Sequence, residues 1–255
     1  MWTIRQEQAE VFRQNALQKF EDEMVEHLKK FAPRHWKVMG EKDGRRVIRL
    51  GIEQAEKHGF TNRGPVRFYI ELMFMFGSFF DTDPQHPWAS TVLADSDSGH
   101  QDVRADRLYA AMNTYLAQVV EPEREHLRGA VQPLLDAQFE DVIQPRTNLE
   151  NGILKMLHSV CPTRCEYVGE PVLRRLIQHG FKLAQDYGFD SDKGRVLMVI
   201  LTFVVGHGFS NDPLNGWIVR RLNNPRWPDP NRQVDELASK SLLYLKHILA
   251  GAENA

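Results

Sequence analysis

The phrase GSFFDTDPQHPW at residues 77–88 decides the fold, because GHGFSNDPLNGW repeats its pattern at residues 206–217. Both follow Gly-x-x-Phe-x-x-Asp-Pro-x-x-x-Trp, and the second begins 129 positions after the first. Shifting the chain by 129 positions, without a gap, gives about two dozen identities over roughly a hundred positions, many of them Gly, Pro and Trp. We therefore predict an internal duplication.

The start of each copy has the spacing of a helix. Apolar residues recur every four or eight positions up to Phe31, and again between Leu149 and Val160. Thr3 and Thr147 are each followed three residues later by Gln or Glu, which predicts a capping box at each start. Both helices are followed by proline, which favours a stop.

The next helices in each copy lead to the centre of the predicted fold. We expect a helix over 42–58, with Gly59 in the left-handed position past its end and Thr61 as the cap of the following helix. The third helices, over 62–79 and 191–208, are apolar nearly all round. Such helices belong in the middle of a bundle, where these two could pack against each other.

The predicted fold class is an all-α helical bundle. Residues 1–120 form the first repeat, 121–145 a connecting helix and 146–255 the second repeat. No segment shows strand-like alternation with turn punctuation, so no sheet is expected. We expect the two repeats to pack into one body, which could be one continuous domain, because the third helices are too apolar to face solvent.

Composition narrows the class of function. The 255 residues are 42% hydrophobic and carry a net charge of −2, and no basic stripe interleaves with aromatics, so we expect no nucleic-acid partner. The longest apolar run, Phe68 to Phe80, contains Glu71 and is too short for a membrane span. Cys161 and Cys165 make no disulfide framework and are compatible with a cytoplasmic protein. The oligomeric state does not follow from the sequence.

The repeated Asp-Pro-x-x-x-Trp phrase is the candidate functional site. One interpretation is a paired partner-binding surface made of Asp83, Pro84, Trp88, Asp212, Pro213 and Trp217. The other is a helix start in each copy, because Asp is a good N-cap, Pro suits the first helical position and Trp can close the corner on the core. The second interpretation is favoured, since every residue type then has a local role.

No cofactor, metal site or catalytic residue is predicted. Asp81, Asp83 and His86 could form a metal cluster, but Ser210, Asp212 and Asn215 replace them in the second copy. There is no H-E-x-x-H, phosphate loop or dinucleotide fingerprint. The repeated pairs Arg45-Arg46 and Arg174-Arg175 could bind an acidic partner helix, although a solvated helix face with local salt bridges is the commoner use.

The stretch RLGIEQAEKHGFTNRGPVRFYIELMFMFGSFFDTDPQHPWA, residues 49–89, resembles small helical accessory proteins of bacterial type VI secretion effector clusters. Their pattern has an Arg-Leu-Gly-Ile helix, a Tyr-x-x-Leu-Met-Phe helix, then Phe-Asp-x-Asp-Pro and Pro-Trp-Ala. The resemblance covers about a sixth of the chain, and the second copy lacks the Phe-Asp and Pro-Trp pairs. It implies an accessory role in handling a toxin and no catalytic residues.

Two classes of function remain open at this point. The first is a non-catalytic binding protein, either a co-chaperone or adaptor that binds a secreted effector or its loading adaptor, or an immunity protein that neutralises a toxin. The second is an enzyme whose site is assembled from dispersed residues, which requires a concave pocket with converging ionisable groups. Binding is favoured, with Trp88 and Trp217 as the expected anchors.

Overall fold

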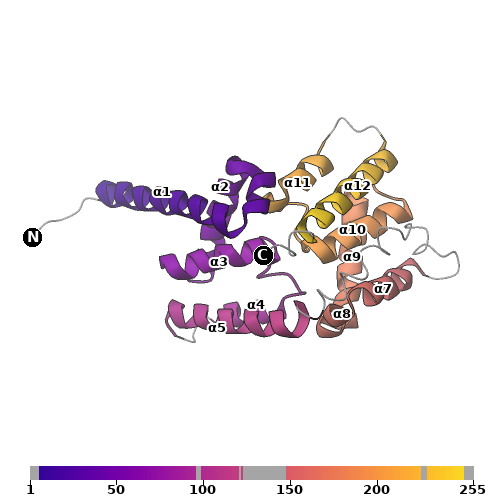
Figure 1. The fold of residues 1–255 in the computed structure, drawn as a ribbon, viewed down its shortest axis with the longest axis horizontal. Coiled ribbons are helices and arrows are strands. Elements are labelled where there is room, and N and C mark those ends of the chain that lie inside the picture. Colours follow the sequence, from indigo (N-terminus) through magenta and orange to yellow (C-terminus); the bar gives the residue numbers. More distant parts are fainter. Residues whose placement is uncertain (1–5, 96–98, 121, 123–147, 225–228, 250–255) are drawn as a thin grey trace, which may run out of the picture.

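The computed structural model describes residues 6–95, 99–120, 122, 148–224 and 229–249, and over these residues the protein is all-α (Figure 1). Residues 6–120 are called the first half here, and residues 148–249 the second half. The first half contains α1 (Gln6–Phe31), α2 (Pro33–Lys57), α3 (Arg63–Phe76), α4 (Pro87–Ala94), α5 (Gln101–Tyr115) and the π-helix η1 (Leu116–Val120). The predicted connecting helix, 121–145, lies outside the described residues, apart from residue 122.

The second half has corresponding elements in the same order. They are α7 (Leu149–Val160), α8 (Pro162–Val168), α9 (Glu170–Asp186), α10 (Asp192–Val205), the 3₁₀ turn η3 (Pro213–Asn215), α11 (Gly216–Leu222) and α12 (Pro230–Leu249). α10 begins and ends 129 positions after α3. α8 and α9 correspond to the two parts of α2. α2 is kinked at Gly40 (φ 76°), and Gly169 (φ 82°), at the matching position, separates α8 from α9.

The apolar third helices end earlier than the sequence suggested. α3 stops at Phe76 and α10 at Val205, not at residues 79 and 208, because Gly77 and Gly206 follow with φ of 96° and 114°. Backbone in this region cannot continue a right-handed helix and is open mainly to glycine. The phrase after each helix therefore forms a turn.

Two predicted helix caps are wrong. Asn62, not Thr61, is the N-cap of α3, and Thr61 instead donates its backbone N–H to Gln101 Oε1 at 2.6 Å. The N-cap of α7 is Asn148, not the predicted Thr147, and the Asn148 side chain accepts from the Glu150 N–H. Thr3 and Thr147 lie outside the described residues. By contrast, Gly59 has the expected left-handed φ of 72° after α2.

The third helices do lie within apolar cores, but they pack lengthwise on other helices. α3 packs on α2, α5 and α1, whereas α10 packs on α9 and α12. The two meet at their C-terminal ends, where the turns at Gly77 and Gly206 approach each other. The core around α3 also takes in Leu214 and Tyr167, so side chains of the second half complete the core of the first.

Among the described residues, none of the helices combines the length and the apolar character of a membrane span.

The N-terminal part of α1 extends beyond the body of the protein (Figure 1). Its side chains at Val11, Phe12 and Leu17 are 56%, 65% and 42% exposed.

Candidate functional site

The repeated phrase brings the two halves together through an exchange of carboxylates. Asp212 of the second half accepts from the Ser78 backbone N–H at 3.0 Å and from the Ser78 hydroxyl at 2.5 Å. Asp83 of the first half accepts from the His207 backbone N–H at 2.8 Å. Ser78 and His207 each follow the glycine that ends a third helix, so each Asp holds the turn of the other half. We call these four residues the carboxylate exchange.

Both Gly77 and Gly206 are favoured at this junction by their positive φ, and Gly77 also by lack of space. A Cβ on Gly77 would lie 3.2 Å from the Val205 carbonyl oxygen, and one on Gly206 would lie 3.5 Å from Asp83 Oδ2. A Cβ on Gly77 would therefore press on the Val205 backbone, whereas one on Gly206 would make ordinary contacts and would be disfavoured mainly by the positive φ.

The two aspartates differ in what they do locally. Asp212 Oδ1 accepts from the Leu214 N–H at 2.9 Å and caps η3, as the helix-start interpretation predicts. Asp83 Oδ1 accepts from the Gln85 N–H at 2.9 Å, but only a turn follows it. The next helix, α4, begins at Pro87 after His86, so the predicted helix start at Asp83 is wrong for the first half.

Burial and hydrogen bonding shift the pKa values of the two carboxyls in opposite directions. Burial acts to raise the pKa of Asp83, but the His207 imidazole, the His86 imidazole in its protonated form and the backbone N–H groups together hold it below its ordinary value. Burial raises the pKa of Asp212, and the bonds from Ser78 and Leu214 offset this only in part. Burial also lowers the pKa of His86 to about 4, so this imidazole is neutral at pH 7.

The carboxylate exchange has no room for a substrate. Phe76, Phe79, Val205 and Gly208 enclose it together with its own residues, and the gap between them is too small for a water molecule. Two carboxyls with separated pKa values would suit acid–base chemistry only if they faced a reacting group. Here they bind backbone N–H groups, and their role is to hold the halves together.

The tryptophans of the phrase lie in different surroundings. Trp88 is 8% exposed and packs against Phe76, Phe80 and Tyr115, with ring centroids 5.4 to 6.3 Å away. Trp217 is half-buried against the core of the second half. Pro84 and Pro213 are also half-buried. A partner could reach Trp88 only if this part of the core opened, so the packing interpretation accounts better for its position.

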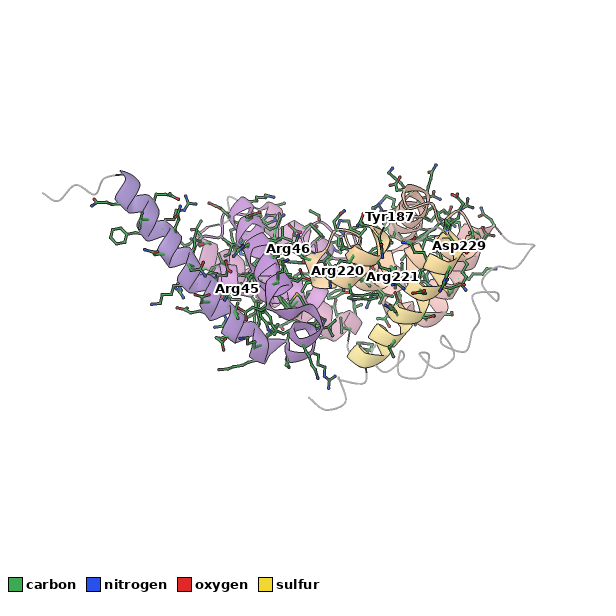
Figure 2. The ribbon with its side chains drawn as sticks, turned by 90° about the horizontal axis from the view of Figure 1, so that it is seen from above. Arg45, Arg46, Tyr187, Arg220, Arg221 and Asp229 are labelled. Atoms are coloured by element: carbon green, nitrogen blue, oxygen red, sulfur yellow. The ribbon has the colours of Figure 1, made fainter. Side chains whose placement is uncertain are left out.

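Further contacts join the halves on either side of the carboxylate exchange. Arg220 of α11 donates to Asp43 of α2 at 2.7 Å, and Arg46 approaches the other oxygen of the same carboxylate at 3.5 Å (Figure 2). Elsewhere, α8 packs on η1, and Tyr167 of α8 meets Tyr115 with ring centroids 5.2 Å apart. The junction therefore has polar, charged and aromatic contacts.

The repeated arginine pairs are largely explained by local salt bridges. Arg45 binds Glu21, Asp22 and Glu41, and so joins α1 to α2. At the matching positions, Arg174 binds Glu150, Asn151 and Glu170, and so joins α7 to α9. The first arginine of each pair is therefore structural and does not form a free surface for an acidic helix.

Three exposed apolar side chains in the first half were not singled out by the sequence. They are Phe31 at the end of α1, Val38 in α2 and Met75 in α3, with exposures of 42%, 53% and 43%, and we call them together the corner face. His35 and Phe74 connect these elements, with ring centroids 6.5 Å apart.

The matching positions in the second half show what such a corner can bind. Tyr167, which matches Val38, packs on Tyr115 and thereby on the end of α5 and η1. Arg164 stacks over Phe203 at 5.2 Å, as His35 meets Phe74. In the second half, Tyr167 therefore packs on a helix segment of the first half, whereas Val38 stays exposed. Val204, which matches Met75, is 42% exposed, much as Met75 is. The signal available in the sequence is that the matched positions hold different residues, Val38 and Tyr167, and periodicity does not reveal it.

Within the described ranges, no group of three or more His, Cys, Asp or Glu side chains is arranged to hold a metal ion. Asp81 and Asp83, considered above as possible metal ligands, have different partners. His58 lies 2.9 Å from Asp81 Oδ2, while Asp83 accepts from the His207 backbone N–H. Comparisons of the chain with protein families, with curated proteins and with solved structures found no match in any of the three.

Proposed function

We propose that this protein is a non-catalytic binding factor that acts in the bacterial cytoplasm as a co-chaperone or adaptor for a type VI secretion effector. The observation that carries the binding role is the exposed Val38 of the corner face, because its counterpart Tyr167 packs on a helix segment of the first half. The effector context rests on the resemblance of residues 49–89 to accessory proteins of such clusters.

The occupied corner specifies the chemistry of the partner segment. There, α8 meets the sequence Tyr115-Leu-Ala-Gln-Val119-Val120, which presents an aromatic side chain and then aliphatic side chains one turn later. The partner of the corner face is therefore an amphipathic helix of the effector or its loading adaptor, with an aromatic residue followed by aliphatic ones at helical spacing. Such helix-in-groove binding is common for apolar surfaces of this kind.

The test places a charge on the corner face without disturbing the core. Val38→Asp, 53% exposed in the wild type, should abolish co-purification with the neighbouring effector or adaptor, because an apolar helix would have to desolvate the carboxylate. Val103→Asp is the matched control, since Val103 is 46% exposed on α5, away from the corner face. Both variants should keep the wild-type melting temperature. Equal binding by both variants would refute the corner face as the docking site.

A cellular assay separates the two binding roles. A co-chaperone is needed for the level or export of the effector, and Val38→Asp should reduce both. An immunity protein instead rescues cells that express the toxin, and rescue by the wild type would replace the proposal with that alternative.

A further inference from the structure

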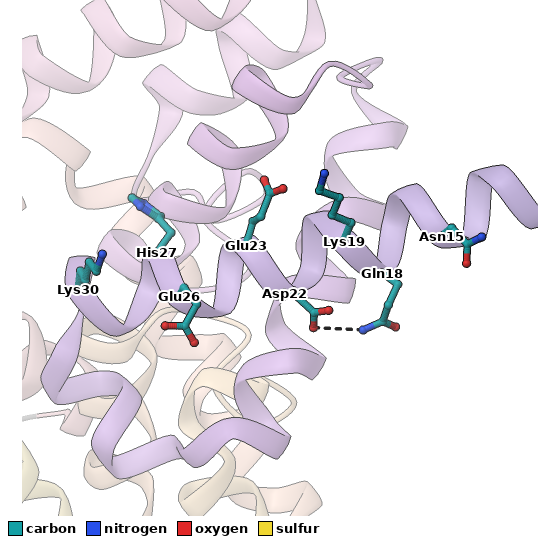
Figure 3. A pocket seen from close by; sticks show the side chains of 8 residues that line it. All are labelled: Asn15, Gln18, Lys19, Asp22, Glu23, Glu26, His27 and Lys30. Carbon is teal, nitrogen blue, oxygen red and sulfur yellow. Dashed lines mark hydrogen bonds between the residues drawn. The ribbon is translucent and has the colours of Figure 1, made fainter.

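The second surface of interest is the side of α1 that faces away from the body. Phe20, Met24 and Leu28 pack into the core on one side of this helix. The opposite side is a shallow groove open to solvent, and every described residue that lines it belongs to α1 (Figure 3). We call this side the outer face of α1.

Four side chains on the outer face have a symmetric arrangement. Phe12, Lys19, Glu23 and Lys30 are separated by seven, four and seven residues, so they follow one side of the helix. The spacing is the same when read from either end. The outer pair, Phe12 and Lys30, and the inner pair, Lys19 and Glu23, are both centred on position 21. A second α1 running antiparallel therefore places Lys19 opposite Glu23 and Lys30 opposite Phe12, each of them twice.

The chemistry of these positions suits that pairing. Lys19 and Lys30 line the groove; Lys30 lies one turn from Glu26 and helps to lower the pKa of that carboxyl, whereas Lys19 forms no ion pair within the described part of the chain. Glu23 binds Arg63 through Oε2, which leaves Oε1 for a second cation. Phe12 is 65% exposed and offers its ring to an ammonium group. Contacts between the same residues of both chains define a two-fold, self-complementary interface.

We propose that the outer face of α1 binds the same face of a second copy of this chain, antiparallel and centred on position 21. The proposal does not depend on the corner face, whose Phe31 follows Lys30 at the C-terminal end of α1. One helix pair buries less than the ~1,600 Å² of a standard interface, so the dimer is weak and depends on protein concentration. Its ion pairs are exposed, so it weakens further as salt rises.

Charge reversal in separate and mixed samples tests the pairing. In a Lys19→Glu homodimer two glutamates face two glutamates, and in a Glu23→Lys homodimer two lysines face two lysines. Each variant alone should sediment as a monomer where the wild type dimerises, with a dissociation constant raised roughly tenfold or more. Mixed together, the two variants restore both opposite-charge pairs, and the heterodimer should return.

Lys29→Glu is the control, because Lys29 lies on the same helix outside the groove and pairs with Glu26. A wild type that stays monomeric up to millimolar concentration would overturn the proposal. So would a dimer that both reversals leave intact, or a mixture that fails to associate.

A cross-link tests the direction of the pairing even if Glu23→Lys, which loses the Arg63 contact, fails to fold. Phe12→Cys and Lys30→Cys proteins, mixed under mild oxidation, should form a disulfide-linked heterodimer in preference to either homodimer. Preferential linkage of position 12 to position 12 would indicate parallel helices and reject the antiparallel interface.

Discussion

The two halves share the residues that end their helices and hold them together, and they differ in their exposed side chains. Glycines that end helices, arginines that join neighbouring helices and carboxylates that hold the opposite turn recur 129 positions apart. The features that recur are the ones that the backbone requires. The features that do not recur, such as the exposed Val38 and the long α1, are available for contacts with other molecules. The matching positions described above therefore support the architecture, and the diverging positions are the ones on which our two proposals rest.

The largest difference between matching positions is expected at Gly51 and Gly180. A Cβ on Gly180 would lie 2.7 Å from Val199 Cα and 2.9 Å from its backbone nitrogen, whereas one on Gly51 would meet only the side chains of Ile70 and Met73. Side chains can move more easily than backbone, so Gly180→Ala should destabilise the protein by about 3 kcal/mol or more, and Gly51→Ala by about 1–2 kcal/mol. Urea unfolding of both variants measures the difference, and equal costs would show that α10 can shift away from α9.

A smaller difference is expected between the two aspartates of the carboxylate exchange. Asp83→Asn removes a charged acceptor whose ionised form the site favours, which should cost about 2–3 kcal/mol. Asp212→Asn should cost about 1 kcal/mol, because burial already disfavours the ionised form and the amide can donate to the Ser78 hydroxyl. The same unfolding measurement checks this order, and a more costly Asp212→Asn would contradict the assigned electrostatics.

The smallest effect is expected in the pH dependence of the same variants. The pKa of Asp83 is lowered by folding, so its stabilisation is present above its ordinary value of 3.8 and is lost as pH falls through the folded value. Asp83→Asn should flatten the acid loss of stability. Asp212 has the opposite sign: its raised pKa makes folding relatively more favourable as pH falls toward 3.8, and Asp212→Asn should remove this gain. Unfolding midpoints between pH 7 and pH 3 would show parallel curves if the two sites were alike.

The sequence was a good guide where the determinant is local. Helix type follows from apolar spacing, and the Gly59 corner follows from one glycine, with Phe60 buried behind it as its position after the turn requires. Apolar periodicity predicts ends for α3 and α10 that are three residues too late, because the apolar runs continue past Gly77 and Gly206, where the helices stop.

The candidate site was predictable in its residues and not in its contacts. Asp83 and Asp212 stood out because they repeat, but their partners Ser78 and His207 lie more than a hundred residues away along the chain. Local rules of helix capping describe Asp212 correctly and fail for Asp83, whose geometry is set by the opposite half. The duplication itself stays a prediction from the sequence. The bounds of α3 and α10, which are 129 positions apart, agree with the shift on which it is based.

The carboxylate exchange has a consequence for how the chain can be divided. Each turn after a third helix takes an acceptor from the other half, so a fragment comprising either half alone would leave a backbone N–H without its native partner. Two fragments produced by a break between residues 120 and 148 should therefore be unstable apart and reassociate when mixed. We therefore expect the two halves to fold as one unit even when the chain between them is broken, and neither half to fold by itself.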